Sequence, residues 1–200
     1  TYLAECISKV LQTDLHIVPS PQMASDIQGF ANAMGEYSGV AFTRGYENGG
    51  VILMDEPDRG VQEAIIVANS ALANGYMDVP TKGTVYKNEG TRIICAMNTN
   101  GMGATEEYNT AVKMDASFLS RFFVLKVVWE HDVAMKLAHD DAEIVEFIED
   151  FRQSRATFEN MKGAILGYRE VINLARISAE PVPMPSLISM MGAVDKCAIG

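Results

Sequence analysis

The sequence predicts an α/β protein in which a mainly parallel sheet is covered by helices on both faces and a small all-helical subdomain follows. Three observations lead to this fold class. Uniformly apolar, strand-like runs alternate with helix-like segments up to Trp129. From His131 onward only helix-like segments follow. The 200 residues, 48% of them hydrophobic, are enough for one α/β domain with a helical appendage.

The first fifty residues combine one helix, one strand and a long irregular segment. Residues 1–11, TYLAECISKVL, have apolar side chains at helical spacing and predict an amphipathic helix. Residues 14–20, DLHIVPS, predict a short strand that Pro19 closes. Between Gln22 and Gly50 the sequence is irregular and glycine-rich, which indicates a loop over the surface that adds little to the core.

The next seventy-nine residues supply the rest of the predicted sheet. Three runs are apolar along their whole length and predict buried strands: 51–54 (VILM), 92–97 (RIICAM) and 122–129 (FFVLKVVW). Residues 61–75 predict a helix that Gly75 stops. Residues 77–90 predict a hairpin around Lys82 and Gly83.

The character of the sequence changes after Trp129. Three segments with helical periodicity follow: 131–160, 164–180 and 186–200. Prolines at positions 181, 183 and 185 punctuate the last break. We therefore expect two parts, an α/β subdomain over 1–130 and a helical subdomain over 131–200.

The composition of the chain argues against some classes of binding partner. The formal net charge is −10, with 26 acidic and 16 basic side chains, and this field repels nucleic acid and anionic membrane surfaces. No apolar stretch approaches the roughly 20 residues of a membrane span. Three widely separated cysteines suit free thiols in a reducing compartment. We expect a cytoplasmic protein, with neither membrane nor nucleic acid as a partner.

Polar side chains stand at the tips of two predicted strands. Asp55 and Glu56 follow the first buried run, and Asn98 and Thr99 follow the second. In parallel α/β sheets the ligand crevice lies outside the carboxyl ends of the strands, so these residues are candidates for a site. The alternative is that such acids enter solvent or cap the next helix, as Asp58 is placed to do.

Two arginines follow, Arg121 in MDASFLSRFFVLKV and Arg169 in LGYREVI. An acid pair, a strand-end Asn and then two arginines is the order of parts in an AAA+ ATPase. In the stretches GGVILMDE, ALANGYMDVP, AMNTNGMGATEEY and MDASFLSRF the chain resembles that superfamily. The likeness is closest to its dynein-related, MoxR-like branch, which includes cobalt-chelatase ATPase subunits and many phage ATPases.

The resemblance implies a P-loop NTPase fold of the AAA+ type, with ATP and Mg²⁺ as cofactors. Asp55 is similar to the Walker B aspartate that helps to hold Mg²⁺, and Glu56 to the carboxylate that polarises the attacking water. Asn98 resembles sensor 1, which fixes water relative to the γ-phosphate. The implied activity is ATP hydrolysis coupled to remodelling of a protein partner or to assistance of metal chelation.

The resemblance also assigns the two arginines. Arg121 is similar to the arginine finger that reaches a neighbouring subunit's site, which implies a homo-oligomer, a hexameric ring in this family. Arg169 resembles sensor 2, which contacts the nucleotide and reports its state to the helical lid. The alternative for either residue is a surface ion pair. Pro57, Ser120 and the GYR string before sensor 2 depart from the usual pattern.

One motif of such ATPases is missing from the 200 residues. No G-x-x-x-x-G-K-[ST] string occurs, although backbone amides and a lysine in that loop hold the phosphates. In the family a helix like that of residues 1–11 follows the lysine directly, so Thr1 corresponds to the hydroxyl that contacts Mg²⁺. We expect a chain that starts just after this lysine, lacks the first strand and the loop, and is inactive alone.

Two other interpretations fit parts of the sequence. Gly101 and Gly103 follow a strand as in a dinucleotide fingerprint, but Glu106 occupies the third glycine position and excludes it. The rival to an ATP-driven motor is a nucleotide-free structural or regulatory module of the same fold. The identity of the remodelled protein is not encoded in these motifs.

Overall fold

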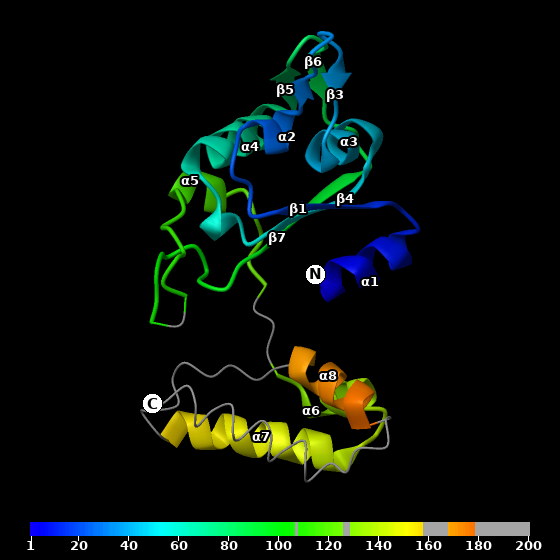
Figure 1. Cartoon of the computed structure of the whole chain (residues 1–200), viewed down its shortest axis with the longest axis vertical. Coiled ribbons are helices and arrows are strands. Elements are labelled where there is room, and N and C mark those ends of the chain that lie inside the picture. The colour runs from blue at the N-terminus through cyan, green and yellow to red at the C-terminus, as the bar shows by residue number, and fades with distance from the viewer. Residues whose placement is uncertain (107, 126–128, 158–167, 179–200) are drawn as a thin grey trace. The chain divides into compact units, whose positions relative to one another are not determined.

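The computed structural model describes residues 1–106, 108–125, 129–157 and 168–178 (Figure 1). The chain divides into two compact units, Thr1–Val124 and Leu125–Gly200. The first unit contains, in order, α1 (Tyr2–Leu11), β1 (Leu15–Pro19), α2 (Ser25–Gln28), β2 (Phe30–Ala31), β3 (Tyr37–Ser38), α3 (Ala41–Asn48), β4 (Gly50–Asp55), the 3₁₀ helix η1 (Pro57–Arg59), α4 (Gln62–Asn74), β5 (Tyr76–Val79), β6 (Gly83–Tyr86), β7 (Thr91–Ala96) and α5 (Ala116–Leu119).

A three-stranded parallel sheet in the order β1-β4-β7 organises the first unit. The central strand β4 pairs with a neighbour on each side, and its residues Gly50 to Met54 are buried. A hydrophobic run suits this position because both faces and both edges are covered. The predictions of an α/β fold, of a parallel sheet and of strands at these three places are confirmed.

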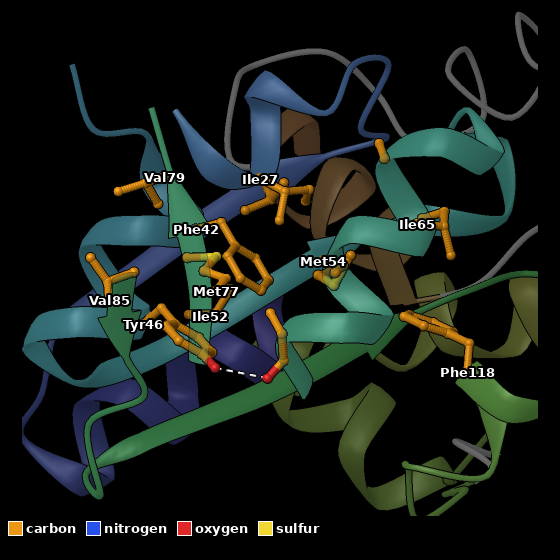
Figure 2. Close-up of a cluster of buried hydrophobic side chains, with 14 of the residues drawn as sticks. Ile27, Phe42, Tyr46, Ile52, Met54, Ile65, Met77, Val79, Val85 and Phe118 are labelled. Atoms are coloured by element: carbon orange, nitrogen blue, oxygen red, sulfur yellow. Dashed lines mark hydrogen bonds between the residues drawn. The ribbon is translucent and has the colours of Figure 1, made fainter. Parts of the chain in front are cut away.

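Helices cover both faces of the sheet. Successive side chains of a strand point to opposite faces, so Ile52 and Met54 share one face and Val51 and Leu53 the other. On the first face α3 packs against all three strands, and Figure 2 shows Ile52 and Met54 in a cluster with Tyr46. On the other face α1 packs against β1 and β4.

The segment from Gln22 to Gly50 contributes to the core, and our prediction of a surface loop there was wrong. Ile27 on α2 and both Phe42 and Tyr46 on α3 are fully buried. The Tyr46 hydroxyl donates a 2.7 Å hydrogen bond to the Ala71 carbonyl of α4 (Figure 2). The signal was weak because α3 is only eight residues long and presents few apolar residues at helical spacing.

The predicted third strand does not form in its described part. Residues 122–125 have no regular structure, and Phe123 is 92% exposed. Residues 122–125 do not pair with the outer edge of β7, so among the described residues β7 is an edge strand of the sheet. For the same reason the side chains of β7 are only partly buried, against our expectation of a fully buried strand. Residues 126–128 lie outside the described part.

Other local predictions of the first unit are confirmed. Ten of the first eleven residues, Tyr2–Leu11, form α1, and α4 ends at Gly75, which adopts a left-handed conformation with φ of 73°. Glycine is favoured there because a Cβ makes this conformation costly. The hairpin is present as the antiparallel pair β5 and β6.

The described part of the second unit is helical. It contains α6 (His131–Leu137), α7 (Ala142–Thr157) and α8 (Tyr168–Ser178), and no strand lies among its described residues. Their core includes Ala134, Ile148 and Val171, all fully buried. The predicted helix over 186–200 falls outside the described residues. None of the described helices combines the length and the apolar character that a membrane crossing requires.

At Gly45 the helix α3 lies close against the sheet, and this position provides a test of the packing. A Cβ there would lie 2.6 Å from both His16 Cδ2 and Ile52 Cγ1. We expect Gly45→Ala to lower the free energy of unfolding by about 1–3 kcal/mol, because overlap in a packed core outweighs the helix preference of alanine. Urea denaturation followed by circular dichroism measures the change.

The control is Arg44→Ala, which alters an exposed neighbour on the same helix. Its effect should stay within about 0.5 kcal/mol. A Gly45→Ala protein as stable as this control would contradict the close packing of α3.

Candidate functional site

The acid pair lies where β4 ends and the chain turns into η1. Ser20 donates its backbone N–H to the Asp55 carbonyl at 2.7 Å, and Glu56 donates its own to the Ala96 carbonyl at 2.8 Å. Glu56 has φ of 50° and ψ of 49°, a left-handed conformation that is uncommon outside glycine and that concentrates at functional sites. Hydrogen bonds to both neighbouring strand ends thus hold the backbone that carries the two carboxylates.

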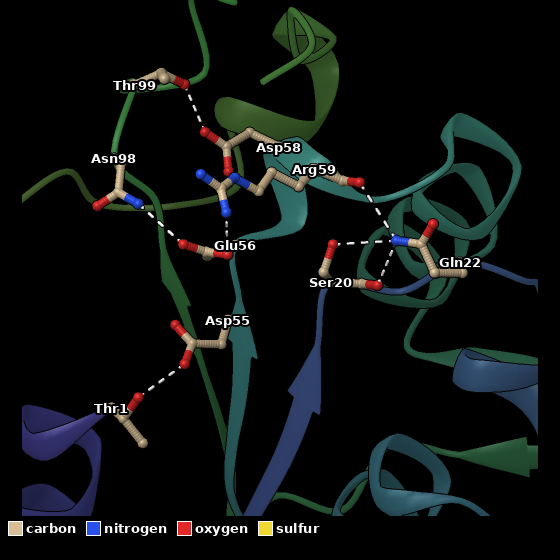
Figure 3. Close-up of polar contacts among 9 residues, drawn as sticks. All are labelled: Thr1, Ser20, Gln22, Asp55, Glu56, Asp58, Arg59, Asn98 and Thr99. Carbon is tan, nitrogen blue, oxygen red and sulfur yellow. Dashed lines mark hydrogen bonds and ion pairs between the residues drawn. The ribbon is translucent and has the colours of Figure 1, made fainter. Parts of the chain in front are cut away.

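Thr1 lies beside the first of these acids. Its hydroxyl Oγ1 donates a 2.8 Å hydrogen bond to Asp55 Oδ2 (Figure 3). Fifty-four positions separate the two residues in sequence. The start of α1 and the tip of β4 therefore present one hydroxyl and one carboxylate to the same space.

Glu56 is held by two partners. Asn98, which follows β7, donates from Nδ2 to Glu56 Oε1 at 3.1 Å, and Arg59 Nη1 lies 3.1 Å from Oε2 (Figure 3). Both members of the Arg59–Glu56 pair are 37% exposed, so the pair adds little stability and mainly orients the carboxylate. We did not predict a role for Arg59, although its spacing of three from Glu56 was a usable signal.

A buried contact supports the loop after β7. Asp58 and Thr99 are 2% and 6% exposed, and the Thr99 hydroxyl donates to Asp58 Oδ2 at 2.5 Å. Asp58 does not cap the following helix as we considered, because α4 begins after Val61 without a side-chain cap. The bond instead fixes η1 against the residue next to Asn98, and so helps to position both partners of the Glu56–Asn98 pair.

A third strand end joins the same network. Gln22 donates from Nε2 to the Ser20 carbonyl at 2.7 Å and to the Arg59 carbonyl at 3.3 Å (Figure 3). The carboxyl ends of β1, β4 and β7 are thus connected by hydrogen bonds.

Arg121 lies directly after the short helix α5, not before a strand as we expected. Its side chain is exposed, and its Nε donates to Asn69 Oδ1 on α4 at 2.6 Å. Among the described residues it forms no ion pair.

Asp115 caps the start of α5. Its hydrogen bonds to Ser117, of which the side-chain bond has the larger effect and the backbone bond the smaller, hold the pKa of the Asp115 carboxyl below its ordinary value.

Neither protein-family models nor curated protein sequences match this chain. The geometry of the strand ends and the sequence motifs are therefore the features that bear on function. The structure brings Thr1 to Asp55 and Asn98 to Glu56.

The remaining predicted residue is on another unit. Arg169 occupies an exposed position of α8 in the second unit, and its assignment stays a prediction.

The donor set at Asp55 suits only some metals. Among the described residues, no group of three or more His, Cys, Asp and Glu side chains is close enough to bind one ion. A carboxylate with a hydroxyl is instead the kind of partial site that Mg²⁺ uses, because this ion keeps several waters and takes phosphate oxygens as ligands.

The buried Asp58–Thr99 bond can be tested by removing its donor. We expect Thr99→Val to lower the free energy of unfolding by about 2 kcal/mol, because the buried Asp58 carboxylate loses a charge-assisted hydrogen bond. The shift of the urea midpoint, at constant denaturant slope, measures this loss. Thr110→Val changes an exposed threonine and should shift the midpoint little. Equal shifts in the two variants would mean that the bond does not stabilise the site.

Proposed function

We propose that this chain carries the metal-binding and water-activating residues of an ATPase of the AAA+ type, in its MoxR-like branch. One observation carries the proposal: two hydrogen-bonded pairs, Thr1–Asp55 and Asn98–Glu56, meet at the adjacent carboxyl ends of parallel strands. Ligand sites of α/β sheets lie at this edge. Both pairs have the residue types that phosphoryl transfer to water requires.

The first pair fits a magnesium ion. The Thr1 hydroxyl and the Asp55 carboxylate are hard oxygen donors, and they would hold Mg²⁺ together with phosphate oxygens and water. The ion supplies neutralisation of the charge on the phosphates. Asp55 is suited to orient such an ion because backbone hydrogen bonds on both sides fix the end of β4.

The second pair fits water activation. Glu56 accepts hydrogen bonds from Asn98 and Arg59, one on each carboxylate oxygen, and each oxygen retains a lone pair for a water molecule. Glu56 would take a proton from that water while Asn98 fixes its direction toward the γ-phosphate. Arg59 keeps the carboxylate turned toward Asn98.

Phosphate binding needs groups that these 200 residues lack. No G-x-x-x-x-G-K-[ST] string occurs among them, so the proposal requires the phosphate-binding amides and lysine to come from other residues of the full-length protein. The tests below therefore use the full-length protein.

Arg121 supports a shared site between subunits. Among the described residues its side chain donates to a neutral amide and forms no ion pair, so its positive charge has no matching carboxylate there. A guanidinium without a carboxylate partner in its own chain can stabilise the charge that develops on the phosphates during hydrolysis in a neighbouring subunit's site. We assign a homo-oligomeric, hexameric ring, an α/β subdomain over 1–130 with a helical lid over 131–200, and Arg169 as the lid's nucleotide sensor.

For the activity of the ring we propose only a general class. Hydrolysis would drive remodelling of a protein partner or assist metal chelation by a partner subunit, in the cytoplasm. The same site serves remodellers of unrelated targets, so the residues of the site do not choose among them.

The first test removes the charge of the proposed base. In the full-length protein, Glu56→Gln should lower ATP turnover by roughly 10²- to 10⁴-fold and leave nucleotide affinity nearly unchanged, because Mg²⁺ and phosphate contacts are spared. Steady-state phosphate release and nucleotide titration give the two quantities. Glu63→Gln, an exposed acid in the first turn of α4, is the matched control and should retain full turnover. Normal hydrolysis by Glu56→Gln would reassign Glu56 to a structural role, whereas absence of hydrolysis in the unaltered full-length protein would favour the nucleotide-free module.

The second test asks whether Arg121 acts across a subunit boundary. Arg121→Ala and Glu56→Gln should each be inactive, since the finger contributes roughly 10³-fold or more in related systems. After subunit exchange in an equal mixture, roughly a quarter of the interfaces should pair an intact Glu56 with an intact Arg121. ATP turnover should return accordingly. Zero turnover despite demonstrated exchange would exclude a finger that acts in trans.

A further inference from the structure

Asn69 joins the helix that follows the acid pair to the segment that carries Arg121. It lies on α4, half-buried, and its Oδ1 accepts the 2.6 Å hydrogen bond from Arg121 Nε. Its Nδ2 donates to Ser117 Oγ on α5 at 2.9 Å. The orientation of the amide follows from chemistry: a guanidinium has no acceptor, so the oxygen must face Arg121.

The hydrogen bond uses Nε of Arg121, and this affects what the rest of the guanidinium can bind. A bond at Nε fixes the plane of the guanidinium, and within the described part of the chain the terminal nitrogens, Nη1 and Nη2, make no hydrogen bond and can form a fork toward an anion. Asn69 is also neutral, so it orients Arg121 without cancelling its charge. An aspartate at the same place would keep the bond but retain the cation in its own chain.

The two helices that flank the contact, α4 with Asn69 and α5 just before Arg121, are both anchored in the core. Ala68, next to Asn69 on α4, is fully buried against the core, and Phe118 of α5 is fully buried as well. The Asp115 cap fixes the start of α5. A flexible, exposed arginine is therefore held by an amide whose own position is set by packing, which is how a binding group is held in a productive orientation.

We infer that Asn69 is a positioning residue for Arg121, which orients the guanidinium toward the nucleotide site of a neighbouring subunit. The inference rests on the proposed ATPase function. It assigns to α4 a second role: the helix begins just after η1, beside the acids of its own site, and it also aims the residue given to the next site.

The first experiment measures ATP hydrolysis by the full-length Asn69→Ala protein. The turnover number should fall by about 10- to 100-fold, because a misdirected group loses most of its effect on the transition state. The KM for ATP and the assembly state should remain unchanged. Asn74→Ala is the matched control, since Asn74 lies on the same helix and donates only to Ser70 among the described residues.

A double variant tests whether Asn69 acts through Arg121. If it does, Asn69→Ala with Arg121→Ala should hydrolyse ATP at the rate of Arg121→Ala alone. A further loss in the double variant would mean that Asn69 acts by another route and would overturn the inference.

Subunit mixing separates positioning from misfolding. Asn69→Ala mixed with Glu56→Gln should regain turnover, because Asn69→Ala subunits still supply Glu56 and the partners supply an oriented Arg121. Asn69→Ala mixed with Arg121→Ala should not exceed the reduced turnover of Asn69→Ala alone, because every finger is defective. Full activity of Asn69→Ala beside an inactive Arg121→Ala refutes the inference alone, whereas full activity of Arg121→Ala refutes the proposed finger itself.

Discussion

The parallel register of three strands is the constraint on which the candidate site depends. Asp55 pairs with Pro19 on one side and with Ala96 on the other, so all three strands end at the same level. Backbone hydrogen bonds beyond the last pairs extend this alignment to Ser20 and Glu56. A shift of one residue in either pairing would turn the side chains at the strand tip to the opposite face and separate the acids from their partners.

The fold also links two places that the sequence keeps far apart. The chain leaves β4 through η1 into α4, so the helix that follows the acids is anchored at the strand tip. Alanines at positions 64, 68 and 71 let this helix pack closely on the core. Its outer side reaches α5 through Asn69. One packed element thus connects the Glu56 carboxylate with the Arg121 guanidinium.

The sequence predicted those elements whose signal is local. The apolar run of β4 and the glycine that ends α4 can be recognised without knowing what packs against them. The two acids at the tip of β4 are then found from the end of that run. The helix α3 was not predicted because it is only eight residues long. It contains just two large apolar residues, Phe42 and Tyr46, which are too few to give a clear helical pattern. The run from Phe122 was overpredicted because an apolar run becomes a strand only when it pairs with a sheet edge, and residues 122–125 do not pair with the open edge of β7. Contacts such as Asn69–Arg121 depend on tertiary packing and leave no trace in spacing.

The sheet's β7 edge has a further consequence for handling the molecule. Among the described residues this edge carries backbone donors and acceptors without a neighbouring strand, and in the same unit Phe123 and Val124 are 92% and 74% exposed. Unprotected edges of this kind accept strands from other chains, and exposed apolar runs promote sticking. In isolation these 200 residues have a route to aggregation through this edge, and association between chains increases with protein concentration unless another strand or surface covers it.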